Sequence, residues 1–395
     1  MDFYAAPKIP MSSPDIGDEE REAVLSVLNT KYLSMGPYIG QFEEAICKYT
    51  GAKHAIGVNS GTSGLHLCVR AAGIGPGDLV LTTPFSFVSS ANVALFEQAT
   101  PVFVDVEERT GNIDVEQLAE AAADLGEGGK RAQKWLPRKN TPENGKLKAI
   151  IPVDVFGQPP NMDPIIDLAR KNDLTIIEDS CEALGGEYKG RKAGTLGDFG
   201  VFAFYPNKQI TVGEGGMIVT DNDAAADMMR SLRNQGRAVG DTWLQHKILG
   251  YNYRMDEMSA ALGTVQMKRL SELLGNRARV AGWYEDGLAG LDAIDLPQLS
   301  PECTDVSWFV YVVRLHKEFN RDEVAAALNV YGVPIRSYFT PIHLQPYMTE
   351  MFGYQKGDYP ITEMLGKQNM AIPFSGSMSH KQVDQVCSAL RDVLG

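Results

Sequence analysis

The sequence lacks cysteine pairs, long apolar runs and an excess of basic residues. Its five cysteines form no CxxC pair and have no metal-type spacing, so we expect reduced thiols in a cytoplasmic protein and no bound metal. No uncharged apolar run has the length needed to span a bilayer, and residues 1–4 do not begin a signal peptide. The formal net charge of −13 argues against nucleic acid or an anionic membrane as a main partner.

The 395 residues suffice for two or three domains with large apolar cores. Strand-like and helix-like segments alternate from residue 55 to residue 220, which predicts an α/β fold with a mainly parallel central sheet flanked by helices. From about Ile294 the pattern changes to a smaller α+β unit. We therefore predict an N-terminal arm (1–16), a large α/β domain (17–248) and a long linking helix followed by a small α+β domain (249–395).

Two apolar runs each lead to a residue suited to catalysis. Asp179 ends a run that begins at residue 174, and Lys208 follows a run over residues 200–204. At the carboxyl edge of a parallel sheet, an amine and a carboxylate placed in this way converge where ligands bind. The pair suits pyridoxal phosphate (PLP), because lysine forms a Schiff base with its aldehyde and aspartate keeps its pyridine nitrogen protonated. Taken singly, Lys208 also fits a solvated loop and Asp179 a helix cap.

A turn of small residues, 60–64, lies between a predicted strand and a predicted helix. The N–H groups at the start of a helix can hold a phosphate group, although Ser60 or Thr62 would also serve as a plain helix cap. Phe85 and Phe87 follow another strand. One of them could stack on a flat cofactor ring, and both also fit the apolar core.

Three further segments carry expectations about structure. Residues 126–147 are polar and basic in an acidic chain; we favour a surface loop, and the alternative is a loop that meets an anionic substrate or a partner subunit. Residues 258–274 predict a long helix that continues beyond Asn276, and residues 306–315 predict a strand.

Five motifs, in this order, resemble those of the DegT/DnrJ/StrS family of sugar aminotransferases, which have the fold-type-I PLP architecture. The motifs are residues 59–67, 84–87, 178–185, 208–216 and 250–255, so the resemblance covers nearly the whole chain. The resemblance implies that Lys208 forms the Schiff base with PLP and then moves a proton between substrate and cofactor carbons. It also implies that Asp179 binds the pyridine nitrogen.

The resemblance assigns the other cofactor contacts as well. It implies that Phe87 stacks on one face of the ring and that Glu182 lies near the phenolic oxygen. It also implies that Gly61, Thr62 and Ser63 bind the phosphate group.

The resemblance also implies a homodimer with shared active sites. Asn252 and Arg254 would reach the site of the neighbouring subunit, with Asn252 at the phosphate. One position departs from the family, which usually has serine five residues before the lysine, where this chain has Ala203. A methyl group cannot donate a hydrogen bond, so Thr62, Ser63, Asn252 or water must compensate.

The implied reaction is amino transfer. PLP takes an amino group, from L-glutamate by expectation, and becomes pyridoxamine phosphate (PMP), which then aminates a keto group of a nucleotide-linked keto-deoxysugar. We favour a 4-keto over a 3-keto sugar, in polysaccharide or glycoside biosynthesis. The candidate substrate contacts are Arg254, Arg336, Tyr338 and His343.

Two other functions fit the same family. One is a PLP-dependent sugar dehydratase, but similar proteins of that type replace the lysine with histidine. The other is a regulatory or sensor protein without catalysis, which the presence of both Lys208 and Asp179 disfavours.

Overall fold

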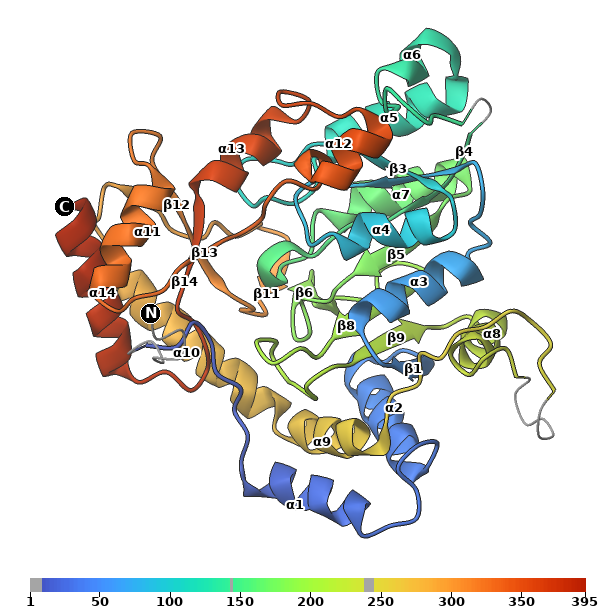
Figure 1. Ribbon diagram of the computed structural model, residues 1–395, viewed down its shortest axis with the longest axis horizontal. Helices are drawn as coiled ribbons and strands as arrows, with labels where there is room; N and C mark the ends of the chain where they lie inside the picture. The colour runs from blue at the N-terminus through green and yellow to red at the C-terminus, as the bar shows by residue number, and fades with distance from the viewer. Residues whose placement is uncertain (1–8, 143–144, 238–244) are drawn as a thin grey trace.

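The computed structural model describes residues 9–142, 145–237 and 245–395. Figure 1 shows a large layered α/β body at the right and a smaller body at the left, with α10 (Leu270–Leu288) running between them. Residues 1–8 of the expected N-terminal arm lie outside the described residues. The domain boundaries at residues 16 and 248 stay predictions.

The large body is built on a sheet with the strand order β1-β9-β8-β5-β4-β2-β3. β9 is antiparallel to both of its neighbours, and the other neighbouring strands are parallel. The strands are β1 (His54–Val58), β2 (Asp78–Thr82), β3 (Thr100–Phe103), β4 (Lys146–Ile150), β5 (Thr175–Asp179), β8 (Phe199–Ala203) and β9 (Gly216–Thr220). The predicted mainly parallel sheet is therefore confirmed.

Helices cover both faces of this sheet, which is why β3 and β9 are buried along their whole length. The helices of the large body are α1 (Asp18–Leu28), α2 (Pro37–Thr50), α3 (Gly61–Ala71), α4 (Ser89–Phe96), α5 (Val115–Glu127), α6 (Gly129–Gln133), α7 (Met162–Asn172), α8 (Asp223–Arg233) and α9 (Glu257–Lys268), with a short 3-10 turn at Val155–Gly157. One apolar cluster joins the sheet to α3 and α8, and another joins it to α5 and α7.

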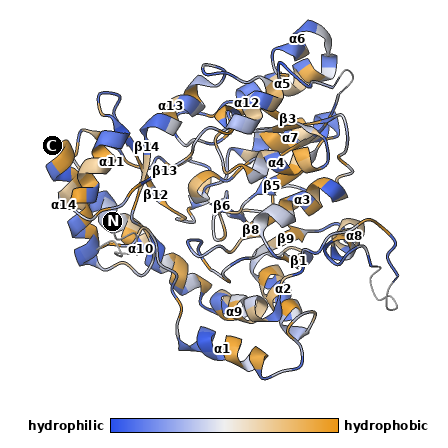
Figure 2. Ribbon diagram, in the orientation of Figure 1, coloured by the Kyte–Doolittle hydropathy of each residue, from blue (hydrophilic) through white to orange (hydrophobic). Residues whose placement is uncertain are grey.

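The smaller body has an antiparallel sheet in the order β10-β12-β14-β13. Its strands are β10 (Ile294–Asp295), β12 (Tyr311–Leu315), β13 (Arg336–Ser337) and β14 (Asn369–Ile372), and its helices are α11 (Arg321–Val330) and α14 (His380–Leu394). Between β13 and β14 the chain forms a 3-10 turn at Ile342–Leu344, α12 (Pro346–Phe352) and α13 (Pro360–Gln368). The turn and α12 lie over the large body, where they pack against α4 and β3. α10, α11 and α14 share the apolar core of the smaller body. In Figure 2 hydrophobic and hydrophilic colours alternate along α14, as expected of a helix with one buried face.

A short third sheet joins the two bodies. β11 (Cys303–Asp305) pairs with β6 (Glu187–Tyr188), and β6 pairs with β7 (Arg191–Lys192). The chain therefore leaves the smaller sheet after β10, crosses to the large body at β11 and returns to the smaller sheet at β12. None of the described helices is long and apolar enough to cross a membrane.

Three expectations about the elements were wrong in detail. The long helix predicted over residues 258–274 is two helices, α9 and α10, which change direction at Arg269, where the side chain pairs with Asp15, Glu20 and Glu272. The strand predicted over residues 306–315 begins only at Tyr311, because the residues before it form backbone hydrogen bonds with the large body.

The third detail concerns residues 126–147. This segment contains α6 and packs on α12: Arg138 pairs with Asp358 at 2.6 Å, and Asn140 donates to the Met351 carbonyl oxygen. Residues 143–144 lie outside the described residues. The segment is thus partly helical and bound to the chain between β13 and β14.

Gly157 provides a test of how closely the chain before β12 approaches the large body. Its φ is +100°, and an added Cβ would lie 1.7 Å from the Ser307 carbonyl oxygen, whereas Gly290 has a φ of +73° with open space around it. We expect Gly157→Ala to lower the free energy of unfolding by about 2–5 kcal/mol, from backbone strain plus overpacking. Gly290→Ala carries only the strain and should cost about 1–2 kcal/mol. Urea denaturation measures both, and equal losses would contradict the proposed close approach.

Candidate active site

A cavity of about 500 Å³ opens at the edge of the central sheet where β5 and β8 end. Asp179 is the last residue of β5, and Lys208 lies in the turn that follows β8. Since these strands are parallel neighbours, their carboxyl ends meet at one edge. Both residues line the cavity, so the structure brings them together as expected.

Asp179 is buried and held by two donors. The Ser90 hydroxyl donates to Oδ2 at 2.6 Å, and the Cys181 N–H donates to Oδ1 at 3.3 Å. Ser90 in turn lies 2.9 Å from the hydroxyl of Ser86. These bonds fix the direction in which the carboxylate faces the cavity.

The Lys208 amine has two close neighbours. Its Nζ lies 3.7 Å from Oε1 of Glu182 and 3.8 Å from the centre of the Phe309 ring. The other Glu182 oxygen accepts the Phe156 N–H at 3.0 Å. Burial raises the pKa of the Glu182 carboxyl, while the nearby Lys208 amine acts in the opposite direction. Glu182 therefore stands between the Lys208 amine and the backbone at Phe156.

The N-terminus of α3 forms the opposite wall. The first-turn N–H groups of Gly61 and Thr62 are not used by the helix itself. A Cβ on Gly61 would lie 2.8 Å from both the Ala203 Cβ and the Cys181 Sγ, so only glycine fits here. This close-packed end can accept an anionic group.

The hydroxyl groups at the N-terminus of α3 form other hydrogen bonds than we expected. The Ser63 N–H donates to the Ser60 hydroxyl, and the Ser63 hydroxyl donates to the Asn59 side chain. Ser63 does not line the cavity. Thr62 does line it, and its hydroxyl lies 2.7 Å from that of Ser89 at the start of α4. Thr62 and Ser89 thus bring two hydroxyls to the cavity that Ala203 also lines.

Phe87 lies at the cavity with 63% of its surface exposed. Phe85, the other aromatic candidate, is fully buried and packs edge-on against Phe339. The sequence left the choice open, and the structure favours Phe87, since an exposed ring is free to stack on a flat ligand.

Of the expected substrate contacts in the described chain, Tyr338 lines the cavity and the other three do not. Burial raises the pKa of Tyr338 to about 12. Arg254 donates to the Asn234 side chain, and Arg336 is exposed on the edge strand β13. The expectation that His343 lies at the substrate was wrong.

His343 is fully buried among the helices between β13 and β14. Its Nε2 lies 3.1 Å from Oε1 of Glu363 on α13, and its ring packs on Tyr359. Burial lowers the pKa of His343. It holds the 3-10 turn to α13 and faces no substrate within its own chain.

Asn252 is exposed between two anchored tyrosines. Tyr251 donates to Glu97 at 2.9 Å, and the Tyr253 hydroxyl lies 3.0 Å from Nδ1 of His66 on α3. The two tyrosine rings stack with their centres 4.9 Å apart. This segment is therefore fixed to α3, whose N-terminus borders the cavity, yet Asn252 is exposed and does not line the cavity of its own chain.

Sequence reasoning missed several lining residues, among them Ser89, Tyr205, Asn207 and Phe309. Asn207 lies next to Lys208 in the sequence, and adjacency could have pointed to it. Phe309 carried no such signal, because it enters the site from a distant part of the chain.

The cavity fits PLP. It offers a buried carboxylate for the pyridine nitrogen, an amine for the aldehyde, a helix start for the phosphate and an exposed ring for stacking. Together with the mainly parallel sheet, these features define a PLP-dependent transferase of fold type I.

The comparisons agree with this class. The model of the DegT/DnrJ/EryC1/StrS aminotransferase family matches residues 14–391. The chain is 38% identical over 392 residues to a GDP-perosamine synthase of Caulobacter vibrioides, with 98% of this chain and 99% of that protein covered. It is 35% identical over 399 residues to the spore coat polysaccharide biosynthesis protein SpsC of Bacillus subtilis, with 98% and 97% covered.

A solved structure shows the same fold. DesV of S. venezuelae, in complex with a ketimine intermediate, superposes with a TM-score of 0.86 at 30% identity, with 98% of each chain covered. The chain therefore belongs to the DegT/DnrJ/EryC1/StrS aminotransferase family. It is a PLP-dependent aminotransferase.

Ser90 offers a test of how Asp179 is held. We expect Ser90→Ala to weaken PLP binding by about tenfold or more, because one hydrogen bond to a charged group is lost. Titration of the apo protein with PLP, followed by absorbance, measures the affinity. Ser271→Ala, at an exposed helical serine of α10, is the control. An affinity unchanged by Ser90→Ala would contradict a role for this bond.

Proposed function

We propose that this aminotransferase moves the amino group of L-glutamate to the 4-keto group of a nucleotide-linked deoxysugar. The observation that carries the proposal is the Lys208 amine and the Asp179 carboxylate in one cavity of about 500 Å³. The GDP-perosamine synthase and spore coat polysaccharide relatives support a sugar substrate, and the former supports a nucleotide-linked one. A role in polysaccharide or glycoside biosynthesis follows.

The residues of this chain divide the work. PLP, when bound, supplies an aldehyde carbon that takes up the amino group and a ring that accepts electrons. Asp179 holds a proton at the pyridine nitrogen, and Ser90 keeps the carboxylate directed there. Lys208 moves the proton between the substrate carbon and the cofactor carbon as general base and acid, and Glu182 lies 3.7 Å from its amine.

The substrate side of the site is formed by aromatic and polar groups. Phe87 and Tyr205 are both more than half exposed at the cavity, and Tyr338 adds a hydroxyl. Such rings suit the apolar face of a sugar or a nucleotide base. We place the enzyme in the cytoplasm, because its five cysteines are free thiols.

The active form is proposed to be a homodimer. Asn252 is exposed and does not line the cavity of its own chain, although the neighbouring Tyr253 is anchored to α3. Leu249, close by, is 80% exposed, and α1 and the segment after it expose Leu25, Leu28 and Tyr32. Exposed apolar side chains in such number mark a protein contact surface.

Lys208 is the first residue to test. We expect Lys208→Ala to slow formation of 2-oxoglutarate from glutamate by about 10²–10⁴-fold, because the general base is lost. Borohydride reduction should label Lys208 with a pyridoxyl group in the native protein. Lys268→Ala, at an exposed lysine of α9, is the control. A native protein without the label would favour the regulatory alternative, and a native rate in Lys208→Ala would contradict the mechanism.

The substrate is tested by incubating the protein with glutamate and a panel of keto-sugar nucleotides. We expect a product in which nitrogen has replaced the keto oxygen, and mass spectrometry identifies it. A deoxygenated sugar without added nitrogen would indicate the dehydratase instead.

Shared sites can be tested with hybrid dimers. In a dimer of one Lys208→Ala chain and one Asn252→Ala chain, one site receives the native lysine and the native asparagine if Asn252 crosses to the partner. Since half of the dimers are hybrid and each has one intact site, equal co-expression should give roughly a quarter of native activity. If Asn252 serves its own chain, neither site is intact and activity does not return.

A further inference from the structure

Arg277, near the middle of α10, is a buried cation with only carbonyl partners. It is 4% exposed, and within the described chain it forms no ion pair with a carboxylate. Its guanidinium donates to the backbone oxygens of Asn207 at 3.0 Å, Lys208 at 2.5 Å, Trp308 at 3.1 Å and Phe309 at 3.2 Å.

A cation buried without a carboxylate is costly, because it loses its hydration. This burial lowers the pKa of Arg277 to about 10. An apolar side chain of similar length would fill the space without that cost. The guanidinium adds a rigid set of five N–H donors. Here it forms four hydrogen bonds to carbonyl oxygens. The role of Arg277 is therefore in hydrogen bonding and not in packing alone.

The four carbonyls belong to two segments that are far apart in the sequence. One is the turn that carries Lys208. The other is the end of a crossing segment, residues 296–310, which joins β10 to β12 over the large body. Its Ser307 N–H donates to the Gly157 carbonyl oxygen at 3.0 Å, and Gln209, next to Lys208, donates to the Ser307 carbonyl oxygen at 3.1 Å.

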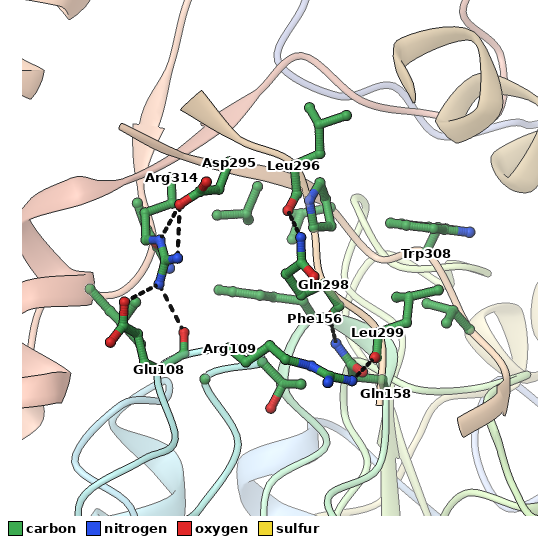
Figure 3. A pocket seen from close by; sticks show the side chains of 18 residues that line it. Glu108, Arg109, Phe156, Gln158, Asp295, Leu296, Gln298, Leu299, Trp308 and Arg314 are labelled. Atoms are coloured by element: carbon green, nitrogen blue, oxygen red, sulfur yellow. Dashed lines mark hydrogen bonds and ion pairs between the residues drawn. The ribbon is translucent and has the colours of Figure 1, made fainter. Parts of the chain in front are cut away.

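The far end of the crossing segment is fastened separately. Figure 3 shows a small cavity of about 50 Å³ there, with Arg109 reaching Leu299 and Arg314 lying between Asp295 and Glu108. With one end held at this cavity, Arg277 sets the other end, where the Phe309 ring stands 3.8 Å from Lys208 Nζ.

We propose that Arg277 is a positioning residue that sets the Lys208 amine and the Phe309 ring relative to each other for reaction with the aldehyde of PLP. In that reaction the amine nitrogen bonds to the aldehyde carbon, and the aldehyde oxygen leaves as water. The inference rests on the proposed role of Lys208. Asp179, the α3 turn and Phe87 would contact the other parts of PLP, and the four hydrogen bonds of Arg277 are made with none of them.

Because of this division of contacts, the affinities for PLP and PMP report different parts of the site. PMP has an amine in place of the aldehyde and cannot bond to Lys208, so it reports only the noncovalent contacts. We expect Arg277→Met to weaken binding of PLP to the apo protein by about tenfold or more and binding of PMP by less than about twofold. Titration followed by protein fluorescence and absorbance measures both affinities, and circular dichroism checks the fold.

Two further variants complete the test. Arg279→Met, at an exposed arginine of the same helix, should change neither affinity. Arg277→Lys keeps the charge but not the fork, and it should show the same preferential loss for PLP, to a smaller extent. It also serves if Arg277→Met does not fold.

The outcomes are distinct. Equal loss of PLP and PMP affinity, or no loss in either Arg277 variant, would overturn the inference and leave Arg277 with a packing role. Peptide mapping of the borohydride-reduced native protein is read in parallel. A native protein without a pyridoxyl group on Lys208 would overturn the proposed function itself, whatever the Arg277 variants show.

Discussion

The site depends on the pairing of β5 with β8. These strands are parallel neighbours with Asp179 opposite Val201, so Asp179 and the turn that carries Lys208 leave the sheet at the same edge. β9 then returns antiparallel beside β8, and its first residue, Gly216, lies so close to Ser60 that a Cβ would stand 2.5 Å from the Ser60 carbonyl oxygen. The same arrangement thus brings the N-terminus of α3 to the cavity.

Several carboxyl groups are buried beneath this edge, and backbone donors offset much of the cost. Glu178 accepts three N–H groups from the loop over residues 194–197, although burial still raises its pKa to about 7. Asp154 is bonded to Ser180 through one oxygen, and burial raises its pKa well above the ordinary value. The Lys208 amine faces this acidic layer through Glu182.

The active site is assembled from segments that share no local sequence pattern. The crossing segment is held at the site by the pairing of β11 with β6 and by Arg277, which bonds to it and to the Lys208 turn. Contacts made across such distances are rigid when the groups are buried and fully bonded. The smaller body thereby takes part in the chemistry of the larger one, and the exposed Asn252 extends this sharing to a second subunit in the proposed dimer.

Local pattern determined much of the fold. Apolar runs and helical periodicity placed the strands of the central sheet and most of its helices, because burial on one or two faces leaves a repeat in the sequence. The order of the motifs pointed to Lys208 and Asp179, and the structure places both in one cavity.

Only the tertiary structure decided the rest. His343 is buried against Glu363 of α13, and the long helix divides at Arg269, whose side chain pairs with three acidic residues. Phe309 and Arg277 reach Lys208 from sequence positions too distant for any periodic pattern to record. Periodicity reports how deeply a residue is buried, whereas the partner it meets there is set by the path of the whole chain.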